Sequence, residues 1–158
     1  MNLDKTDLRI LRELQSNGRM TILALAERVN LSPTACQRRV KQLEEAEVIG
    51  RYGAVINPAA LGLKIQAFVR VNIERQSKDL TESFENAIRK LPEVRACYVM
   101  TGELDFLLHV FVADLEAFAD FSMRKLISLP GVKDVRSSLV LESVKLDEGL
   151  ALSAVKIN

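Results

Sequence analysis

The sequence predicts an α+β protein in which an N-terminal helix-turn-helix domain, of the winged type, precedes a ferredoxin-like βαββαβ domain. Three observations predict this. Apolar residues recur every three or four positions in the N-terminal part, they alternate strictly at residues 64–73, and later apolar runs switch between helical and strand spacing. We place the boundary at the turn sequence Asn57-Pro58, which gives domains of residues 1–58 and 59–158.

Composition limits the classes of protein that this chain can belong to. Its 158 residues are 48% hydrophobic and 27% charged, which is enough for one large or two small cores. No apolar run approaches the roughly 18 residues of a membrane span, and no basic stretch followed by an apolar block opens the chain. We therefore expect a cytoplasmic protein without a membrane partner. Cys36 and Cys97 lie far apart in unlike settings, so no disulfide framework, metal site or cofactor is expected.

Two capped helices are predicted before residue 30. Asp4 should cap a helix over residues 5–16, which Asn17-Gly18 ends, and Thr21 should cap a shorter helix over residues 22–29. Asn30-Leu31 then forms a tight turn before the next cap. The helix at residues 22–29 and the helix that follows this turn are typical of a helix-turn-helix, whose second helix enters the major groove of DNA.

The helix after this turn is the candidate recognition helix. Ser32 is its predicted N-cap and Pro33 its first residue, and one narrow face is apolar, formed by Cys36, Val40 and Leu43. The stretch from Ser32 to Leu43 holds three cations and no acid, which suits phosphates and base edges. Taken alone, it fits a solvated basic face equally well. The helix-turn-helix context favours DNA, and the candidate DNA-binding residues are Ser32, Thr34, Ala35, Gln37, Arg38, Arg39 and Lys41.

Two of these arginines have different predicted roles. Arg38 lies opposite the apolar face and should read bases, whereas Arg39 lies beside that face and should act through helix orientation or phosphate contact. Residues 1–58 carry nine Lys/Arg against seven Asp/Glu, so no broad positive field is present. Binding to double-stranded DNA should therefore depend on one basic helix that a dimer presents twice.

An extended stretch at residues 51–56 follows and is similar to the wing, or linker strand, of winged-helix proteins. Arg51 in this stretch is a candidate phosphate contact, although a solvated side chain is the favoured interpretation.

The second half alternates strands and helices. Strands are predicted at residues 64–73, 94–101, 105–112 and 132–141, and helices at residues 79–91 and 115–129. Gly102-Glu103-Leu104 is short enough to join the middle strands as a hairpin. We expect residues 142–158 to form a closing hairpin around Asp147-Glu148-Gly149. The helices should cover one sheet face, and the mixed polarity of Gln66, Phe68 and Arg70 on the other predicts self-association.

The chain as a whole resembles the Lrp/AsnC family of transcription regulators. The resemblance is carried by Leu31-Ser32-Pro33-Thr34 in the helix-turn-helix and by Thr101-Gly102-Glu103-Leu104-Asp105-Phe106 between the central strands. It implies a bacterial or archaeal regulator with a RAM, or ACT-like, C-terminal domain. It also implies dimers formed through the sheets, further assembly that often reaches an octamer, and an amino acid or related small molecule bound between subunits.

The resemblance also implies an effector site at the central hairpin. An amino acid needs donors for its carboxylate and an acceptor for its ammonium; Thr101 and the backbone near Gly102 can donate, and Asp105 or Glu103 can accept. Without the resemblance, a hairpin with solvated acids would be the favoured interpretation. The candidate effector residues are Met100, Thr101, Gly102, Glu103, Asp105, Phe106, Ser137 and Ser138, the last two contributed by the final strand.

Two other classes of function compete with this one. An enzyme is not expected, because the only histidine, His109, lies within an apolar strand and no metal-ligand spacing, serine elbow or phosphate loop accompanies it. A DNA-organising protein that uses the same helix-turn-helix without any effector is the alternative to a regulator.

Overall fold

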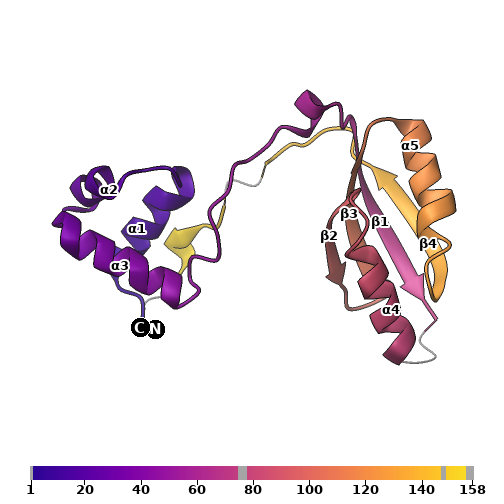
Figure 1. Ribbon diagram of the computed structural model, residues 1–158, viewed down its shortest axis with the longest axis horizontal. Helices are drawn as coiled ribbons and strands as arrows, with labels where there is room; N and C mark the ends of the chain where they lie inside the picture. The colour runs from indigo at the N-terminus through magenta and orange to yellow at the C-terminus, as the bar shows by residue number, and fades with distance from the viewer. Residues whose placement is uncertain (1, 75–77, 147–148, 156–158) are drawn as a thin grey trace. The chain divides into compact units, whose positions relative to one another are not determined.

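The computed structural model describes residues 2–74, 78–146 and 149–155. The chain divides into two compact units, one formed by Met1–Val55 with Lys145–Asn158 and the other by Ile56–Val144. The helix-turn-helix belongs to the first unit and the sheet to the second (Figure 1).

Three helices form the N-terminal unit: α1 (Lys5–Ser16), α2 (Ile22–Val29) and α3 (Pro33–Glu45). The three predicted caps are confirmed, because Asp4, Thr21 and Ser32 each accept a hydrogen bond from the backbone N–H three residues later. The turn between α2 and α3 begins at Asn30, whose φ of 56° lies in the left-handed region that asparagine tolerates. The predicted apolar face of α3 is buried in a core that consists of Ile10, Leu25, Ala26, Val29, Cys36, Val40 and Leu43.

The prediction of a linker strand at residues 51–56 is wrong. These residues form neither helix nor strand, and Val55 is 96% exposed. A single extended segment gains ladder hydrogen bonds only beside a second strand, and no strand of the described residues pairs with it. A short 3₁₀ helix follows at Pro58–Leu61, where the side chain of Asn57 accepts the N–H of Ala59.

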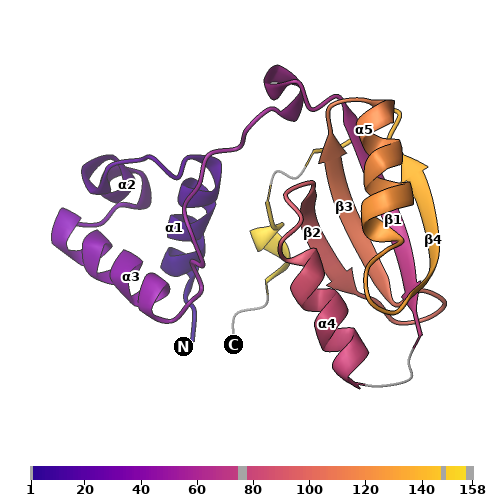
Figure 2. The same cartoon turned by 45° about the vertical axis from the view of Figure 1, so that its right-hand side comes forward.

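The second unit has the predicted βαββαβ order, which is confirmed. Four antiparallel strands lie in the order β2-β3-β1-β4. Both helices cover the same face of this sheet, and the other face is left open (Figure 2). The elements are β1 (Ile65–Ile73), α4 (Lys78–Ile88), β2 (Val94–Val99), β3 (Phe106–Val112), α5 (Leu115–Asp120) and β4 (Val132–Leu139).

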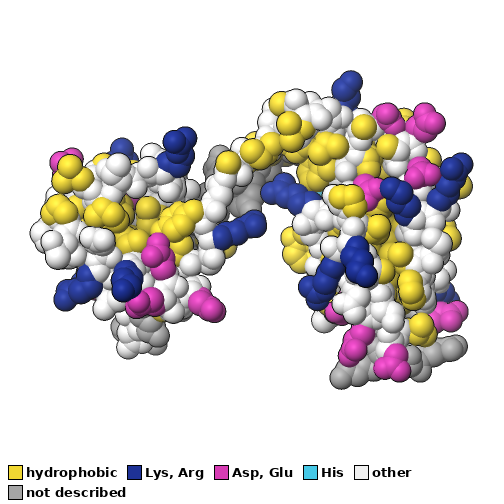
Figure 3. Space-filling view, in the orientation of Figure 1, with side chains coloured by type: hydrophobic (Ala, Val, Ile, Leu, Met, Phe, Trp, Pro, Cys, Tyr) yellow, Lys and Arg dark blue, Asp and Glu magenta, His cyan; other side chains and the backbone are white. Residues whose placement is uncertain are grey.

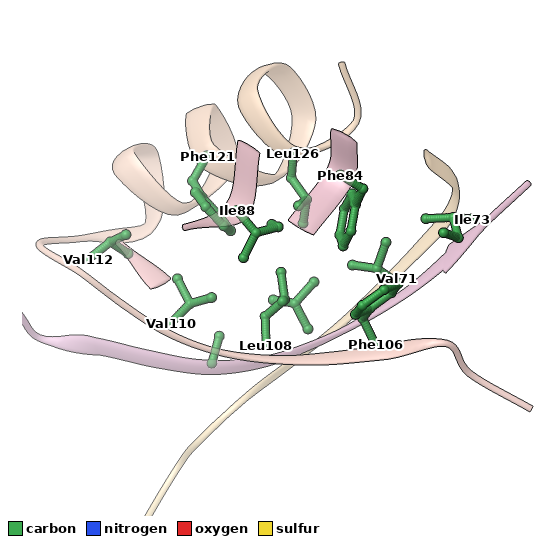
Figure 4. Close-up of a cluster of buried hydrophobic side chains, with 12 residues drawn as sticks. Val71, Ile73, Phe84, Ile88, Phe106, Leu108, Val110, Val112, Phe121 and Leu126 are labelled. Atoms are coloured by element: carbon green, nitrogen blue, oxygen red, sulfur yellow. The ribbon is translucent and has the colours of Figure 1, made fainter. Parts of the chain in front are cut away.

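The core of this unit lies between the sheet and its helices. Every second residue of β1 and β3 points toward α4 and α5, so the side chains meet between the layers (Figure 4). The helix predicted at residues 115–129 differs in one respect, because after α5 it continues as a π-helix over Phe121–Leu126. Phe121 and Leu126 lie five residues apart and are both fully buried. A π-helical turn aligns this spacing, whereas a regular α-helix would turn one of them away from the sheet.

The C-terminal segment also differs from the prediction. Residues 145 onward belong to the N-terminal unit, whereas the sequence placed them with residues 59–158. The side-chain amide of Gln15 on α1 donates to the carbonyl of Leu150 and accepts its N–H, at 2.9 and 3.0 Å. The described part of this segment contains a 3₁₀ helix, Leu152–Ala154, and no strand. Of the turn residues of the predicted hairpin, Asp147 and Glu148 lie outside the described residues.

Candidate functional site

The solvent-facing side of α3 presents the candidate recognition residues. Thr34, Gln37, Arg38 and Lys41 are exposed, opposite the buried face. Lys41 lies 3.5 Å from Glu45, an exposed pair that contributes little, and Arg38 forms no ion pair with any described residue. Of the remaining three candidates, Ser32 and Ala35 bond to each other at the helix start, where the hydroxyl of Ser32 accepts the N–H of Ala35, and Arg39 is engaged elsewhere. Arg38 is therefore the most available of the three cations.

Arg39 is instead engaged within the unit. Its guanidinium lies 2.8 Å from a carboxylate oxygen of Asp4 and 2.7 Å from one of Asp7, and its side chain is only 28% exposed. These bonds, first that to Asp7 and then that to Asp4, raise the pKa of Arg39. The contacts join α3 to the start of α1. Of the two roles predicted for Arg39, they support helix orientation over phosphate contact.

The charge around α3 is mixed. On the face of the N-terminal unit that Figure 3 shows, basic and acidic side chains lie next to one another. This agrees with the nearly balanced charge of residues 1–58. DNA affinity would then come from a few well-placed contacts, and not from a broad positive field.

A second candidate site is an open pocket of about 530 Å³ at one end of the sheet. Three segments converge there: the end of β1, the loop between β2 and β3, and the start of β4. Of the predicted effector residues, the structure brings Gly102, Glu103 and Asp105 into the pocket. The complete lining is Asn72, Ile73, Gly102, Glu103, Asp105, Lys133, Asp134 and Arg136.

Asp105 is held in this pocket by the end of β1. Backbone pairing between β1 and β3 runs as far as Val71 opposite Phe106. One position further, the N–H of Ile73 donates to Asp105 Oδ2 and the N–H of Asp105 donates to Asn72 Oδ1, both at 3.0 Å. Two side chains thus continue the ladder where the backbone ladder stops. The loop and its carboxylate are fixed in place before any ligand arrives.

Five predicted effector residues lie outside this pocket lining. Phe106 is 2% exposed and its ring lies 4.7 Å from that of Phe84, so it belongs to the core. Met100 and Thr101 precede the lining part of the loop, and Ser137 and Ser138 lie further along β4, opposite Val69 and Phe68.

Five lining residues were not among the predicted effector residues: Asn72, Ile73, Lys133, Asp134 and Arg136. They are neighbours of Asp105 only because β1 lies between β3 and β4. The helical and strand spacing of the sequence contains no signal for this strand order. From the last strand, Lys133, Asp134 and Arg136 line the pocket, whereas the predicted Ser137 and Ser138 follow them along the strand and lie outside the lining.

The open face of the sheet holds the only histidine. The ring of His109 stacks on that of Phe68 at 4.7 Å, and its Nε2 lies 2.8 Å from Nε2 of Gln66. Burial, with a smaller contribution from Arg95, lowers the pKa of His109. Among the described His, Cys, Asp and Glu side chains, no group of three could hold a metal ion. Within the same part of the chain, no helix is long and apolar enough to cross a bilayer.

Comparison with known proteins gives matches over both units. A family model described as an Lrp/AsnC ligand binding domain matches residues 66–150, and one described as winged helix-turn-helix DNA-binding matches residues 3–49. The leucine-responsive regulatory protein of Escherichia coli (strain K12) is 38% identical over 151 residues, which is 96% of this chain and 92% of that protein.

Solved structures agree with these matches. A transcriptional regulator from Neisseria meningitidis in complex with L-Met is 49% identical with a TM-score of 0.88, and the match covers 91% of this chain and 93% of that one. A feast or famine regulatory protein from M. tuberculosis complexed with L-methionine is 34% identical with a TM-score of 0.82, covering 94% and 98%.

Proposed function

Because the chain belongs to the Lrp/AsnC family of transcription regulators, we propose that it is a DNA-binding regulator whose effector is an amino acid, L-methionine being the first candidate. The family consists of regulators and not of enzymes. The duplex is contacted by α3, with Arg38 reading base edges and Lys41 and the start of the helix approaching phosphates. This activity belongs in the cytoplasm, where the DNA of a bacterial cell lies.

One observation carries the effector part of this proposal: the pocket at the β2–β3 loop offers charges of both signs within one small volume. Glu103, Asp105 and Asp134 can accept hydrogen bonds from an ammonium, and Lys133 and Arg136 can donate to a carboxylate. An α-amino acid carries both groups on one carbon atom. Two relatives of this chain have been crystallised with methionine, which supports that amino acid as the first to test.

We expect Asp105→Asn to weaken L-methionine binding about ten- to a hundredfold, because a charge-assisted bond to an ammonium contributes roughly 1.5–3 kcal/mol. The asparagine side chain keeps an oxygen that can accept the N–H of Ile73, so the melting temperature should change little. Isothermal titration calorimetry and a melting curve of the same preparation measure both quantities.

Asp114→Asn serves as the matched control, since Asp114 caps α5 outside the pocket lining. If Asp105→Asn lowers the melting temperature and leaves methionine affinity unchanged, Asp105 only holds the loop to β1 and Glu103 becomes the candidate acid.

The proposed regulator is a homodimer that associates through the open face of the sheet, as a step toward an octamer. Phe68 and Tyr98 on this face are 37% and 53% exposed, and the Phe68, His109 and Phe111 rings form a contiguous aromatic group. Such a face is too apolar to remain in water and is of the kind found at subunit interfaces. A dimer also presents α3 twice, which compensates for the weak field of a single unit.

Phe68→Asp is therefore expected to shift the chain from a dimer or larger assembly to a monomer in sedimentation velocity. A charge placed within the aromatic group would have to be buried on association, at a cost of several kcal/mol. Leu115→Asp is the control, because Leu115 is 60% exposed on α5, on the helix-covered side of the sheet. Unchanged assembly of Phe68→Asp, or a monomeric wild-type chain, would contradict this dimer.

A further inference from the structure

Two arginines lie directly opposite each other on the open sheet face. In the antiparallel pairing of β1 with β4, Arg70 is the partner of Arg136. Directly opposite residues point to the same side of a sheet with their Cβ atoms about 4.5–5.5 Å apart, and like charges in this position are destabilising. The sheet therefore holds two cations together where a neutral pair would be more stable.

The surrounding side chains neutralise this pair only in part. The Nε of Arg136 donates to Asp134 at 3.0 Å, but the side chain of Arg136 remains 77% exposed. Arg70 is exposed as well and forms no ion pair with any described residue. Of these two guanidinium groups, only that of Arg136 has a carboxylate partner among the described residues. The arrangement leaves donors directed to solvent beside the pocket, and these donors suit an additional anion.

The acids occupy the next row of the same face. Asn72 is opposite Asp134 on β4 and bonded to Asp105 on the other side, so the three residues cross the sheet in one row at its end. The row of Arg70 and Arg136 lies two residues further along the strands, a separation of about 6.5 Å along the backbone. The pocket therefore has an acidic end and a basic end, and Arg136 lines it at the basic end.

We propose that Arg136, with Arg70 beside it, binds the α-carboxylate of the effector, while the row of Asp105 and Asp134 receives its ammonium. This assignment rests on the proposed amino-acid effector and fixes the direction in which the ligand lies. A guanidinium matches a carboxylate through two parallel hydrogen bonds, and the adjacent like charge makes an anion at this position more favourable. The same contact neutralises the unfavourable Arg70–Arg136 pair, so ligand binding removes a repulsion that the free protein carries.

Calorimetry with the full chain and three ligands tests the orientation. L-Methionine carries both charges, L-methioninamide replaces the carboxylate with a neutral amide, and 4-(methylsulfanyl)butanoate lacks the ammonium. The wild-type chain should bind L-methionine about ten- to a hundredfold more tightly than the amide. In Arg136→Gln this preference should fall to within about threefold, and Arg70→Gln should lower it in the same direction. Asp105→Asn should instead reduce the preference for L-methionine over the butanoate.

Two variants serve as controls. Arg95→Gln removes a cation that lies over the ring of Phe111, outside the pocket lining, and should leave every preference unchanged. Arg136→Lys keeps the charge without the two-pronged donor and should retain part of the preference. A merely structural role of Arg136 would weaken all three ligands equally and would not move the ratio of methionine to amide.

Other results would overturn the assignment. If Arg136→Gln keeps the wild-type ratio, or if only Lys133→Gln loses it, Arg136 does not bind the carboxylate. If Arg136→Gln is monomeric in sedimentation and its ratio is unchanged, the two arginines face acids of a second copy of the chain. If the wild-type chain binds none of the three ligands, the proposed effector itself fails along with the orientation.

Discussion

Asp7→Ala is expected to lower the free energy of unfolding by about 2–3 kcal/mol, a large loss for a single residue on the first turn of a helix. Asp7 is 2% exposed, accepts the N–H of Asp4 at 3.0 Å and pairs with Arg39 of α3 at 2.7 Å. Removing one partner of a fully buried pair costs about 3–5 kcal/mol. The expected loss is smaller because Arg39 is 28% exposed and keeps Asp4 as a partner.

Asp114→Ala is the matched control for this change. Asp114 caps α5 by accepting the N–H of Ala117 at 2.8 Å and is exposed, so its loss removes only a helix cap and should cost about 1 kcal/mol. Urea unfolding of both variants measures the difference. Equal losses in the two variants would show that the contact between α1 and α3 adds nothing to stability.

The same cluster gives stability a dependence on pH. The hydrogen bond from the N–H of Asp7, followed by the contact with Arg39, holds the pKa of Asp4 below its ordinary value of 3.8. A carboxylate whose pKa is lowered by folding stabilises the folded protein. This contribution is complete at pH values above the pKa of the carboxylate in the unfolded chain, and it is lost as the pH falls through the pKa in the folded protein. The contribution of Asp4 should therefore be complete at neutral pH and disappear progressively below about pH 4.

Arg38→Ala is expected to weaken binding to a preferred duplex about five- to a hundred-and-fifty-fold and to reduce sequence preference. The side chain is exposed on the outer face of α3, where a bidentate contact with a base is worth about 1–3 kcal/mol. The duplex would first be selected from a randomised pool, and a scrambled duplex measured at the same salt concentration would report non-specific affinity.

Arg38→Lys separates base recognition from simple charge. Lysine keeps the phosphate attraction but lacks the planar donor pair, so this variant should lose preference for the selected duplex while keeping most of its affinity for the scrambled one. If Arg38→Ala binds both duplexes as the wild type does, Arg38 has no part in DNA recognition.

The helices and strands were predictable because local chemistry determines them. Helix starts can be recognised from capping side chains, as at Asp4, Thr21 and Ser32. The strand at residues 65–73 can be recognised from its alternating apolar residues, because one face of β1 is buried. The π-helix after α5 was missed because a single extra residue between Phe121 and Leu126 does not disturb a helical pattern enough to be noticed.

Only the part of the pocket that the loop between β2 and β3 supplies could be predicted from the sequence. Gly102, Glu103 and Asp105 are neighbours in the chain, whereas Asn72 and Arg136 join them through strand order, which no periodicity encodes. The C-terminal segment contacts α1 through the backbone of Leu150, which is hydrogen-bonded to Gln15, and through the 3₁₀ helix Leu152–Ala154. Gln15 and Leu150 are far apart in the sequence, and their contact uses a backbone and a common side chain. Neither residue type nor spacing in the sequence therefore predicts it.

Binding of the selected duplex, measured at increasing concentrations of L-methionine, tests the central claim most directly. An effector that binds the DNA-bound and the DNA-free protein with different affinities must change the affinity of the protein for DNA. By the same linkage, the duplex must change the affinity for methionine by the same factor. We expect a reciprocal shift of about five- to a hundredfold in one direction, abolished in Asp105→Asn. If DNA affinity stays constant at saturating concentrations of L-methionine and of each other amino acid, the chain organises DNA without an effector, and its pocket has no regulatory role.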